Sequence, residues 1–545
     1  MSKFTQQFLC KVLPSCKRIW CALFQKSVDM KLLVVFAVVY LSPYPNQFAL
    51  GNAVLMDDFI TIDGSVETTV ESIDTTTEEI NVRTTEETGD TTTEDDISIT
   101  AEIADEPFIC TNENLTLSFS NFQISTFGSG FIDSPLISCL NIENLGLTSI
   151  GLGAFNKMPN LRYLNLANNK IQPPHLFDFG SHPKLERLIL NNQEVYNSYD
   201  EIVVKNVYPA LRYLDLSRTK IRRLKGLTSS AIGNIVDNFP ALTYLDLSYN
   251  NIENIDNFVG VSIYEKLTHL HLRGNSISFF WNNNLNNLRV LSLDDNRIER
   301  ISYKSDAYAM QQRYYYGNKV QYLYLYGLEN LQRLTLTRNQ IERIDFEAFS
   351  QMTKLKYLDL SENKIRRVEN LVNAESLRTL LINNNSLTDI PAGAVPSKLT
   401  ILSISCNQIE YLDPDTLSQY PHLKELYLAG NKIKSLDSST FQSQTALEKL
   451  NLAHNKLTYL PEGLITPLKN LRHLDVLGNQ FLNLKSLSLR RSSPLRELYM
   501  QNVIKEIRVS TIEALPENVT VYFYADDKYA PVQCKRDNPN NRNYY

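Results

Sequence analysis

The 545-residue sequence has no apolar run long enough to cross a bilayer. Its most apolar run, residues 32–41, is ten residues long, whereas a membrane-spanning helix needs about 20. Lys31 precedes this run, two prolines follow it, and Gly51 and Ala53 stand at the spacing of a cleavage site. The arrangement is typical of a secretory signal that either starts at Met30 or has a long leading region. The alternative is a short membrane anchor that is never cleaved.

Glycine-rich phosphate loops, nucleophile elbows and cysteine clusters with zinc spacing are absent as well. Each of these motifs supports a common class of enzyme or cofactor site. We therefore expect no enzyme activity and no cofactor.

Basic residues are nearly absent from residues 56–106, which contain seventeen Asp and Glu residues and only Arg83 as a cation. The segment is also rich in threonine. It cannot bury enough apolar surface to offset its chain entropy, so we expect a solvated, self-repelling tether over residues 54–107. The sequence after it is mildly basic, and charge at that density does not indicate a nucleic-acid partner.

From residue 161 onward one frame dominates, L-x-x-L-x-L-x-x-N-x-I/L. Typical copies are "LTYLDLSYNNIENI" (242–255) and "LKYLDLSENKIRRV" (355–368). Leu245 and Leu247 alternate with polar residues, which is the period of a strand with one buried face. One such strand cannot cover its own apolar face, so stacked copies should share a leucine core. The frame begins at fourteen positions: 161, 185, 211, 242, 267, 288, 331, 355, 377, 399, 423, 447, 471 and 495.

The repeated frame resembles the extracellular type of leucine-rich repeat over about residues 136–507, with a degenerate first copy at Ile137. The resemblance implies an α/β solenoid, a leucine-rich-repeat horseshoe with a parallel β-sheet on its concave face. Short helical or irregular segments should cover its convex side. The sequence is similar to the secreted leucine-rich-repeat immune proteins of insects and to the ectodomains of Toll-like receptors.

An asparagine ladder should run through the repeats. Asn250 turns inward after its strand, where its amide can donate to and accept from the loop backbones of neighbouring turns. Ten further copies have asparagine at this position. Four copies have Leu145, Gln193, Thr219 or Val503 instead, and we expect a looser ladder at those turns.

The chain should therefore have five parts. Residues 1–53 contain the signal, and residues 54–107 form the tether. Residues 108–160 form an N-terminal cap with the degenerate copy, residues 161–507 the repeats, and residues 508–545 a C-terminal cap and tail.

Two features interrupt the repeats. Residues 302–330 contain a tyrosine-rich insertion, which is either a looped-out recognition element or an enlarged convex side that packs on itself. A basic cluster could bind a polyanion, although a solvated loop is the favoured interpretation: Arg218, Lys220, Arg222, Arg223 and Lys225.

Only seven cysteines occur, and cleavage of the signal would remove three of them. Cys110 and Cys139 flank the start of the repeats and should form a disulfide. We interpret Cys406 as a buried thiol. A stiff array would hold Cys534 several repeats away from Cys406, so we expect an intermolecular disulfide through Cys534 and a disulfide-linked dimer. Three sequons predict glycosylation, at Asn114, Asn384 and Asn518.

Strand positions that face away from the core should form two columns across the concave face. Tyrosine and arginine are frequent anchors of protein interfaces. We therefore expect a protein ligand on these columns, and the candidate residues are Tyr163, Tyr213, Asp215, Tyr244, Asp246, His269, His271, Arg333, Tyr357, Tyr427 and Tyr499. His269 and His271, beside Asp246, could also hold a metal ion or make a pH-sensitive contact. Ordinary variable positions are the favoured interpretation, so we expect no metal.

The sequence thus favours a secreted leucine-rich-repeat scaffold that binds an extracellular protein, as in innate immune recognition. The alternative is a structural protein of the extracellular matrix or of cell adhesion. Neither a nucleic-acid partner nor a stable membrane span is expected.

Overall fold

The structure of the chain is a computed structural model, and the residues it describes belong to one compact unit, Asp105–Tyr545. The expected signal and tether, residues 1–107, therefore lie outside the described part. So do Val503, Arg223 and Lys225. The described residues are 108–111, 114–119, 123–196, 202–222, 229–231, 234–236, 238–253, 265–280, 285–303, 321–368, 374–392, 397–501, 512, 515–524 and 534.

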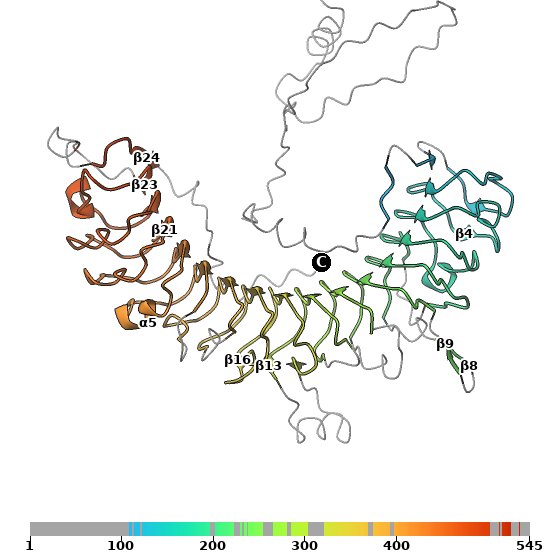
Figure 1. Ribbon diagram of the computed structural model, residues 1–545, viewed down its shortest axis with the longest axis horizontal. Coiled ribbons are helices and arrows are strands. Elements are labelled where there is room, and N and C mark those ends of the chain that lie inside the picture. Colours follow the sequence, from blue (N-terminus) through green and yellow to red (C-terminus); the bar gives the residue numbers. More distant parts are fainter. Residues whose placement is uncertain are drawn as a thin grey trace, which may run out of the picture. The chain divides into compact units, whose positions relative to one another are not determined.

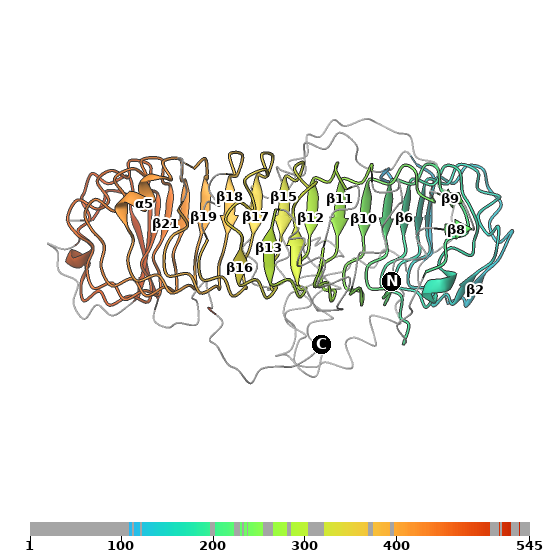
Figure 2. The same cartoon turned by 90° about the horizontal axis from the view of Figure 1, so that it is seen from below.

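The repeats form a parallel sheet of 17 described strands on the inner side of an arc (Figure 1). The strands lie side by side in chain order across the sheet (Figure 2). Neighbours are in register, so that Tyr213 pairs with Tyr244 and Tyr244 with His269. The strands are β1 (Thr116–Ser118), β3 (Cys139–Asn141), β5 (Tyr163–Asn165), β6 (Arg187–Ile189), β7 (Tyr213–Asp215), β10 (Tyr244–Asp246), β11 (His269–His271), β12 (Val290–Ser292), β15 (Arg333–Thr335), β17 (Tyr357–Asp359), β18 (Thr379–Leu381), β19 (Ile401–Ser403), β20 (Glu425–Tyr427), β21 (Lys449–Asn451), β22 (His473–Asp475), β23 (Glu497–Gln501) and β24 (Thr520–Tyr524).

The core lies between this sheet and the convex side. In each copy the leucines of the frame point into it, as Leu242, Leu245 and Leu247 do, with at most 1% exposure. Burying one leucine side chain contributes about 1.5–3 kcal/mol, and neighbouring turns share the same core. The predicted horseshoe with a concave parallel sheet is confirmed.

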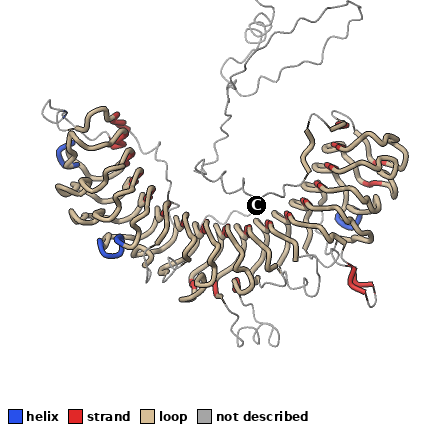
Figure 3. The backbone as a smooth tube through the Cα atoms, in the orientation of Figure 1, coloured by secondary structure: helices blue, strands red, loops and turns tan. Residues whose placement is uncertain are grey.

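The convex side is built mostly of turns, as Figure 3 shows. Its described helices are short: η3 (Pro173–His175), α5 (Pro414–Ser418) and η8 (Leu484–Leu487). None of the helices in the described ranges is long and apolar enough to cross a bilayer. Smaller sheets add to this side or flank it: β2 (Thr126–Phe127) with β4 (Ser149–Ile150), β8 (Ser229–Ala231) with β9 (Asn234–Val236), and β13 (Arg300–Ser302) with β14 (Tyr322–Tyr324) and β16 (Arg343–Ile344).

The tyrosine-rich insertion begins at the end of β13 and contains β14, two strands of the small sheet on the convex side (Figure 1). Residues 304–320, which contain most of it, lie outside the described part. Its described ends pack on themselves. The hydroxyl of Tyr303 donates to Glu329 over 2.8 Å, and the Tyr303 ring meets that of Tyr326 edge-on.

The asparagine ladder has the predicted hydrogen bonds. The Asn250 amide donates to the carbonyl oxygens of Leu216 in the preceding turn and of Leu247 in its own turn, over 2.9 and 3.0 Å. Its Oδ1 accepts from the backbone N–H groups of Thr219 and Ile221. Each ladder amide thus ties two successive turns together.

The expectation of a looser ladder is wrong at Gln193. Its longer side chain donates to the carbonyl oxygens of Leu166 and Leu190 and accepts from the N–H of Ile171, each over 3.0 Å. These are the bonds that an asparagine makes elsewhere, because one extra methylene still leaves the amide in reach. Thr219 behaves as expected, since its hydroxyl donates within its own turn, to Leu216, and makes no bond to a described residue of the turn before.

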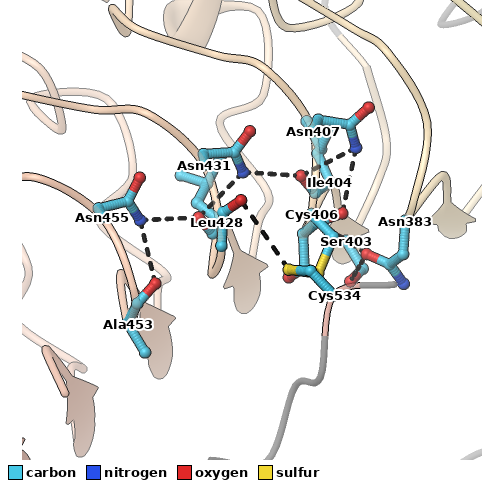
Figure 4. The surroundings of a disulfide bond; sticks show 12 residues. Asn383, Ser403, Ile404, Cys406, Asn407, Leu428, Asn431, Ala453, Asn455 and Cys534 are labelled. Atoms are coloured by element: carbon cyan, nitrogen blue, oxygen red, sulfur yellow. Dashed lines mark hydrogen bonds between the residues drawn. A yellow bond between two sulfur atoms is a disulfide. The ribbon is translucent and has the colours of Figure 1, made fainter. Parts of the chain in front are cut away.

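Two disulfides tie residues from outside the repeat frame to turns of the solenoid. Cys110 and Cys139 are joined as predicted, with a Cα–Cα distance of 6.2 Å. The expected intermolecular bond of Cys534 is wrong, and so is the interpretation of Cys406 as a free thiol. These two cysteines form a disulfide within the chain, with a Cα–Cα distance of 5.2 Å (Figure 4).

The rigidity of the repeats does not prevent this pairing, because Cys534 lies beyond the last strand. It follows Tyr524 by ten residues, which can extend over about 35 Å. The five steps from β24 back to β19 cover only about 24 Å. Gly430 leaves room for the bond, because a Cβ at this position would collide with the sulfur of Cys534.

Candidate functional site

The concave face is formed by the outward side chains of the main strands. In β10 the middle residue, Leu245, is buried, whereas Tyr244 and Asp246 on either side of it are partly exposed. Parallel strands in register repeat this pattern, so these positions line up as two columns, as predicted.

An aromatic stack crosses the columns from β6 to β11. The guanidinium of Arg187 lies 3.9 Å from the ring centroid of Tyr213. The rings of Tyr213 and Tyr244 are stacked with centroids 4.2 Å apart and planes at 13°. Tyr244 also contacts His269 and His271, with centroids 5.6 and 5.0 Å apart. We call these five residues the aromatic stack.

Two carboxylates lie beside the stack. Asp215 is only 7% exposed and accepts from the backbone N–H and hydroxyl of Ser217 and from the amide of Asn191, over 2.7–2.9 Å. Burial nevertheless raises its pKa, with the neighbouring Asp246 adding to the effect. Asp246 accepts from the N–H of Ser248 over 2.8 Å. This part of the concave face therefore combines stacked aromatic rings with two carboxyl groups and the Arg187 guanidinium.

The two histidines of the stack are held neutral. Burial lowers the pKa of His269 to about 4, and His271 and Arg289 act in the same direction. Burial also lowers the pKa of His271, although Asp246 and Asp294 oppose it. Across the described ranges, no group of three or more His, Cys, Asp or Glu side chains is arranged to hold a metal ion.

The centre of the face holds a second cluster around Asp359. This carboxyl group lies in the column of Asp215 and Asp246, and burial raises its pKa to about 7. Arg333 stacks on the Tyr357 ring with its guanidinium 3.7 Å from the ring centroid. Asp294, buried nearby, accepts from the hydroxyl of Thr335 over 2.7 Å.

A further group of side chains covers the C-terminal strands. Tyr427 donates to Glu425 over 2.6 Å. Tyr499 stacks on Tyr522 with centroids 4.6 Å apart, and its other neighbour is His473 at 4.8 Å. Tyr522 belongs to β24 of the C-terminal cap, which has no copy of the repeat frame.

The structure thus brings together six of the predicted residues on β7, β10 and β11: Tyr213, Asp215, Tyr244, Asp246, His269 and His271. Arg333 and Tyr357 form a separate pair, Tyr163 lies on β5 beside Arg187 of the stack, and Tyr427 and Tyr499 lie on more distant strands. The prediction omitted Arg187, Asp359 and Tyr522. The column pattern contained the signal for the first two, but no repeat position marks Tyr522.

The three sequon asparagines differ in their surroundings. Asn518 is exposed, whereas Asn114 and Asn384 are partly buried. Asn114 accepts from the N–H of Thr111 over 3.1 Å, and Asn384 has a φ of 51° in its loop. Their glycosylation stays a prediction.

Comparison with known families supports the repeat assignment. The family described as "Leucine rich repeat" matches residues 324–372, 375–433 and 421–481. The family described as "Zer-1-like, Leucine-rich repeats" matches residues 153–274.

Individual proteins match over shorter stretches or at lower identity. Oligodendrocyte-myelin glycoprotein of Homo sapiens is 39% identical over 75 residues, which cover 14% of this chain and 17% of that protein. Podocan of Mus musculus is 28% identical over 336 residues, 56% of this chain and 53% of podocan. The matched part thus spans about half of podocan's length and less of the glycoprotein's.

A solved leucine-rich-repeat protein of Leptospira interrogans shares the fold with a TM-score of 0.50 and 23% identity, over 71% of this chain and 95% of its own. Leucine-rich repeats thus occupy the matched residues, and the described part of the chain has the leucine-rich-repeat fold.

Proposed function

We propose that this protein is a secreted scaffold that binds a protein partner through its concave face, centred on the aromatic stack. Leucine-rich-repeat domains serve widely as protein-interaction scaffolds. The stack is the observation that carries the proposal, because Tyr213 and Tyr244 are already fixed against each other and against Arg187 in the free protein. Fixed aromatic side chains lose little rotamer entropy on binding.

The chemistry of the stack suits a protein surface better than a small ligand. Tyrosine and arginine at the centre of a patch are typical anchors of interfaces, and polar groups at the rim supply orientation. Asp246 and the phenol groups provide acceptors and donors beside the rings. A partner that presents Lys or Arg side chains would find the Asp246 carboxylate beside the phenol oxygens.

The test is a matched pair of variants, Tyr244→Ala in the stack and Tyr427→Ala on the distant strand β20. The partner is first purified with the intact protein and its affinity then measured with each variant. We expect Tyr244→Ala to weaken binding by at least about thirtyfold, as for a central anchor, and Tyr427→Ala by less than about threefold. Equal affinities of the intact protein and Tyr244→Ala would refute the stack as the binding centre.

Secretion is the second part of the proposal. It rests on the signal-like segment before Ala53 and on two disulfides in the described part of the chain, which persist in oxidising compartments. Amino-terminal sequencing of protein recovered from the culture medium should give a start near residue 54. A start at Met1 or Met30 would contradict cleavage.

For the setting, we propose innate immune recognition, with a structural role in matrix or adhesion as the alternative. The resemblance to secreted immune repeat proteins supports the first setting. Localisation distinguishes them, because a recognition protein should be recovered from soluble fluid and a structural protein from the insoluble matrix.

A further inference from the structure

One edge of the main sheet carries a regular excess of positive charge. The residue directly before each strand from β5 to β23 forms what we call the edge column. Eight of its fourteen members are basic and two are acidic. The members are Arg162, Glu186, Arg212, Thr243, Thr268, Arg289, Gln332, Lys356, Arg378, Thr400, Lys424, Glu448, Arg472 and Arg496.

The backbone fixes these side chains in one line. The N–H of each member donates to the carbonyl oxygen of the member before it, as from Arg289 to Thr268, Gln332 to Arg289 and Lys356 to Gln332, each over 2.8 Å. This ladder continues from Arg162 to Arg496. Thirteen steps of about 4.8 Å give a line of about 62 Å along the edge.

Much of this charge is not neutralised within the chain. Arg162 pairs with Glu186 at 2.7 Å and Lys424 with Glu448 at 3.5 Å, which uses both acidic members. Four exposed members have no ion pair with any described residue: Arg289, Arg378, Arg472 and Arg496. Arg378 and Arg472 donate to backbone carbonyl oxygens at the same edge, of Ser376 and Pro494.

A second row strengthens the line. It consists of four exposed lysines that lie three residues before their strands: Lys184, Lys266, Lys354 and Lys398. In the other turns this position is never acidic. Lys184 and Lys354 donate to asparagine side chains of the preceding turn over 2.7 and 2.6 Å, which holds their ammonium groups along the same edge. Three glutamates lie four residues before their strands: Glu265, Glu329 and Glu375. They reduce the excess of positive charge at this edge but do not cancel it.

We propose that the edge column and its lysine row bind a linear sulfated polysaccharide. A straight row of cations at regular spacing suits a long, evenly charged chain better than a compact anion. Guanidinium groups bind sulfate and carboxylate oxygens in bidentate fashion. The column contains no aromatic residue, so it lacks the stacking platforms that single-stranded nucleic acids use. The site lies outside the aromatic stack and is independent of the partner proposed for it.

The test uses the full-length secreted protein and heparin as the probe. In one variant, Arg289, Arg378 and Arg496 are each changed to Glu. The control variant changes Lys364, Lys434 and Lys456 to Glu, which alters the net charge equally. These lysines are exposed and follow their strands, at the opposite edge. Heparin affinity is measured at several salt concentrations, and both variants must keep the thermal unfolding midpoint of the intact protein.

We expect the intact protein to bind heparin and the edge variant to lose at least tenfold in affinity. The slope of log affinity against log salt should fall by about two to three, roughly one for each lost contact. The control variant should stay within about twofold. Absence of heparin binding by the intact protein would overturn the proposal. So would equal losses in both variants, which would indicate net charge alone. Tighter binding of single-stranded DNA than of heparin at matched charge would assign the edge to nucleic acid instead.

Discussion

Replacing one ladder amide, in the variant Asn363→Ala, tests the register of the whole solenoid. The Asn363 amide donates to the carbonyl oxygens of Leu336, Leu360 and Ser361 over 2.9–3.0 Å, and its Oδ1 accepts from the N–H of Ile341 over 3.0 Å. Asn363 is only 8% exposed, so water does not readily replace it. Alanine would remove all four bonds at once.

The expected cost follows from what each partner retains. The carbonyl oxygen of Leu336 still accepts from Asn339 over 3.2 Å, and that of Leu360 from Asn385 over 2.9 Å. The carbonyl oxygen of Ser361 keeps the N–H of Arg338. Only the N–H of Ile341 loses its acceptor, and one unpaired buried donor costs about 1–3 kcal/mol. We therefore expect a loss of that size rather than four times as much.

Hydrogen exchange gives a local readout, because a global transition of a long repeat array averages over many turns. The Ile341 amide should exchange at least about tenfold faster in Asn363→Ala. The Ile365 amide, which donates to Asn385 over 2.9 Å, is the internal control and should change less. Lys364→Ala, at an exposed neighbour, should leave both amides unchanged. Unchanged protection of Ile341 in Asn363→Ala would refute the ladder register.

Three further predictions concern single groups. The intact protein should run as a monomer on non-reducing electrophoresis, and Cys534→Ser should expose one new thiol, that of Cys406; a disulfide-linked dimer would contradict the pairing. Burial raises the pKa of Asp359 to about 7, above its usual value near 4, so its contribution to stability is present at pH 4 and lost as the pH rises to 7. Between pH 4 and 7 the free energy of unfolding should therefore fall by on the order of 3 kcal/mol less in Asp359→Asn than in the intact protein. Superimposable curves of unfolding free energy against pH for the two proteins would show that the carboxyl group ionises normally. Asn518 is exposed, so Asn518→Gln should reduce the glycosidase-sensitive mass by one glycan, and an identical glycan mass in the variant would exclude this site.

The fold could be predicted because the information that specifies it is local and repeated. Each copy carries its own inward leucines and its own ladder residue, so a reading of Leu245 and Asn250 holds for the other turns. Gln193 was misjudged because the sequence pattern records residue identity, whereas the ladder requires only an amide within reach. Thr219 has no amide, and its turn lost the bond to the preceding one.

The features that sequence reasoning missed depend on relations between turns or on the chain beyond them. Asp359 occupies an outward column and is partly exposed, yet desolvation raises the pKa of its carboxyl group, which the column pattern does not record. The pairing of Cys534 depends on the reach of the chain after the last strand, which no repeat encodes. The edge column was visible in the sequence, but its successive members stand 21–43 residues apart, so no short sequence window contains two of them.

The bond between Cys406 and Cys534 changes how the C-terminal end can come apart. Strands β20 to β24 all lie within the covalent loop that it closes, which spans 128 residues. In an open solenoid the last turn has only one neighbour, so the end can fray turn by turn. Here an unfolded turn stays covalently tethered to the loop after β19, so it gains little conformational entropy when it unfolds. A protease that cuts between these cysteines would leave two pieces that still migrate together until a reductant separates them.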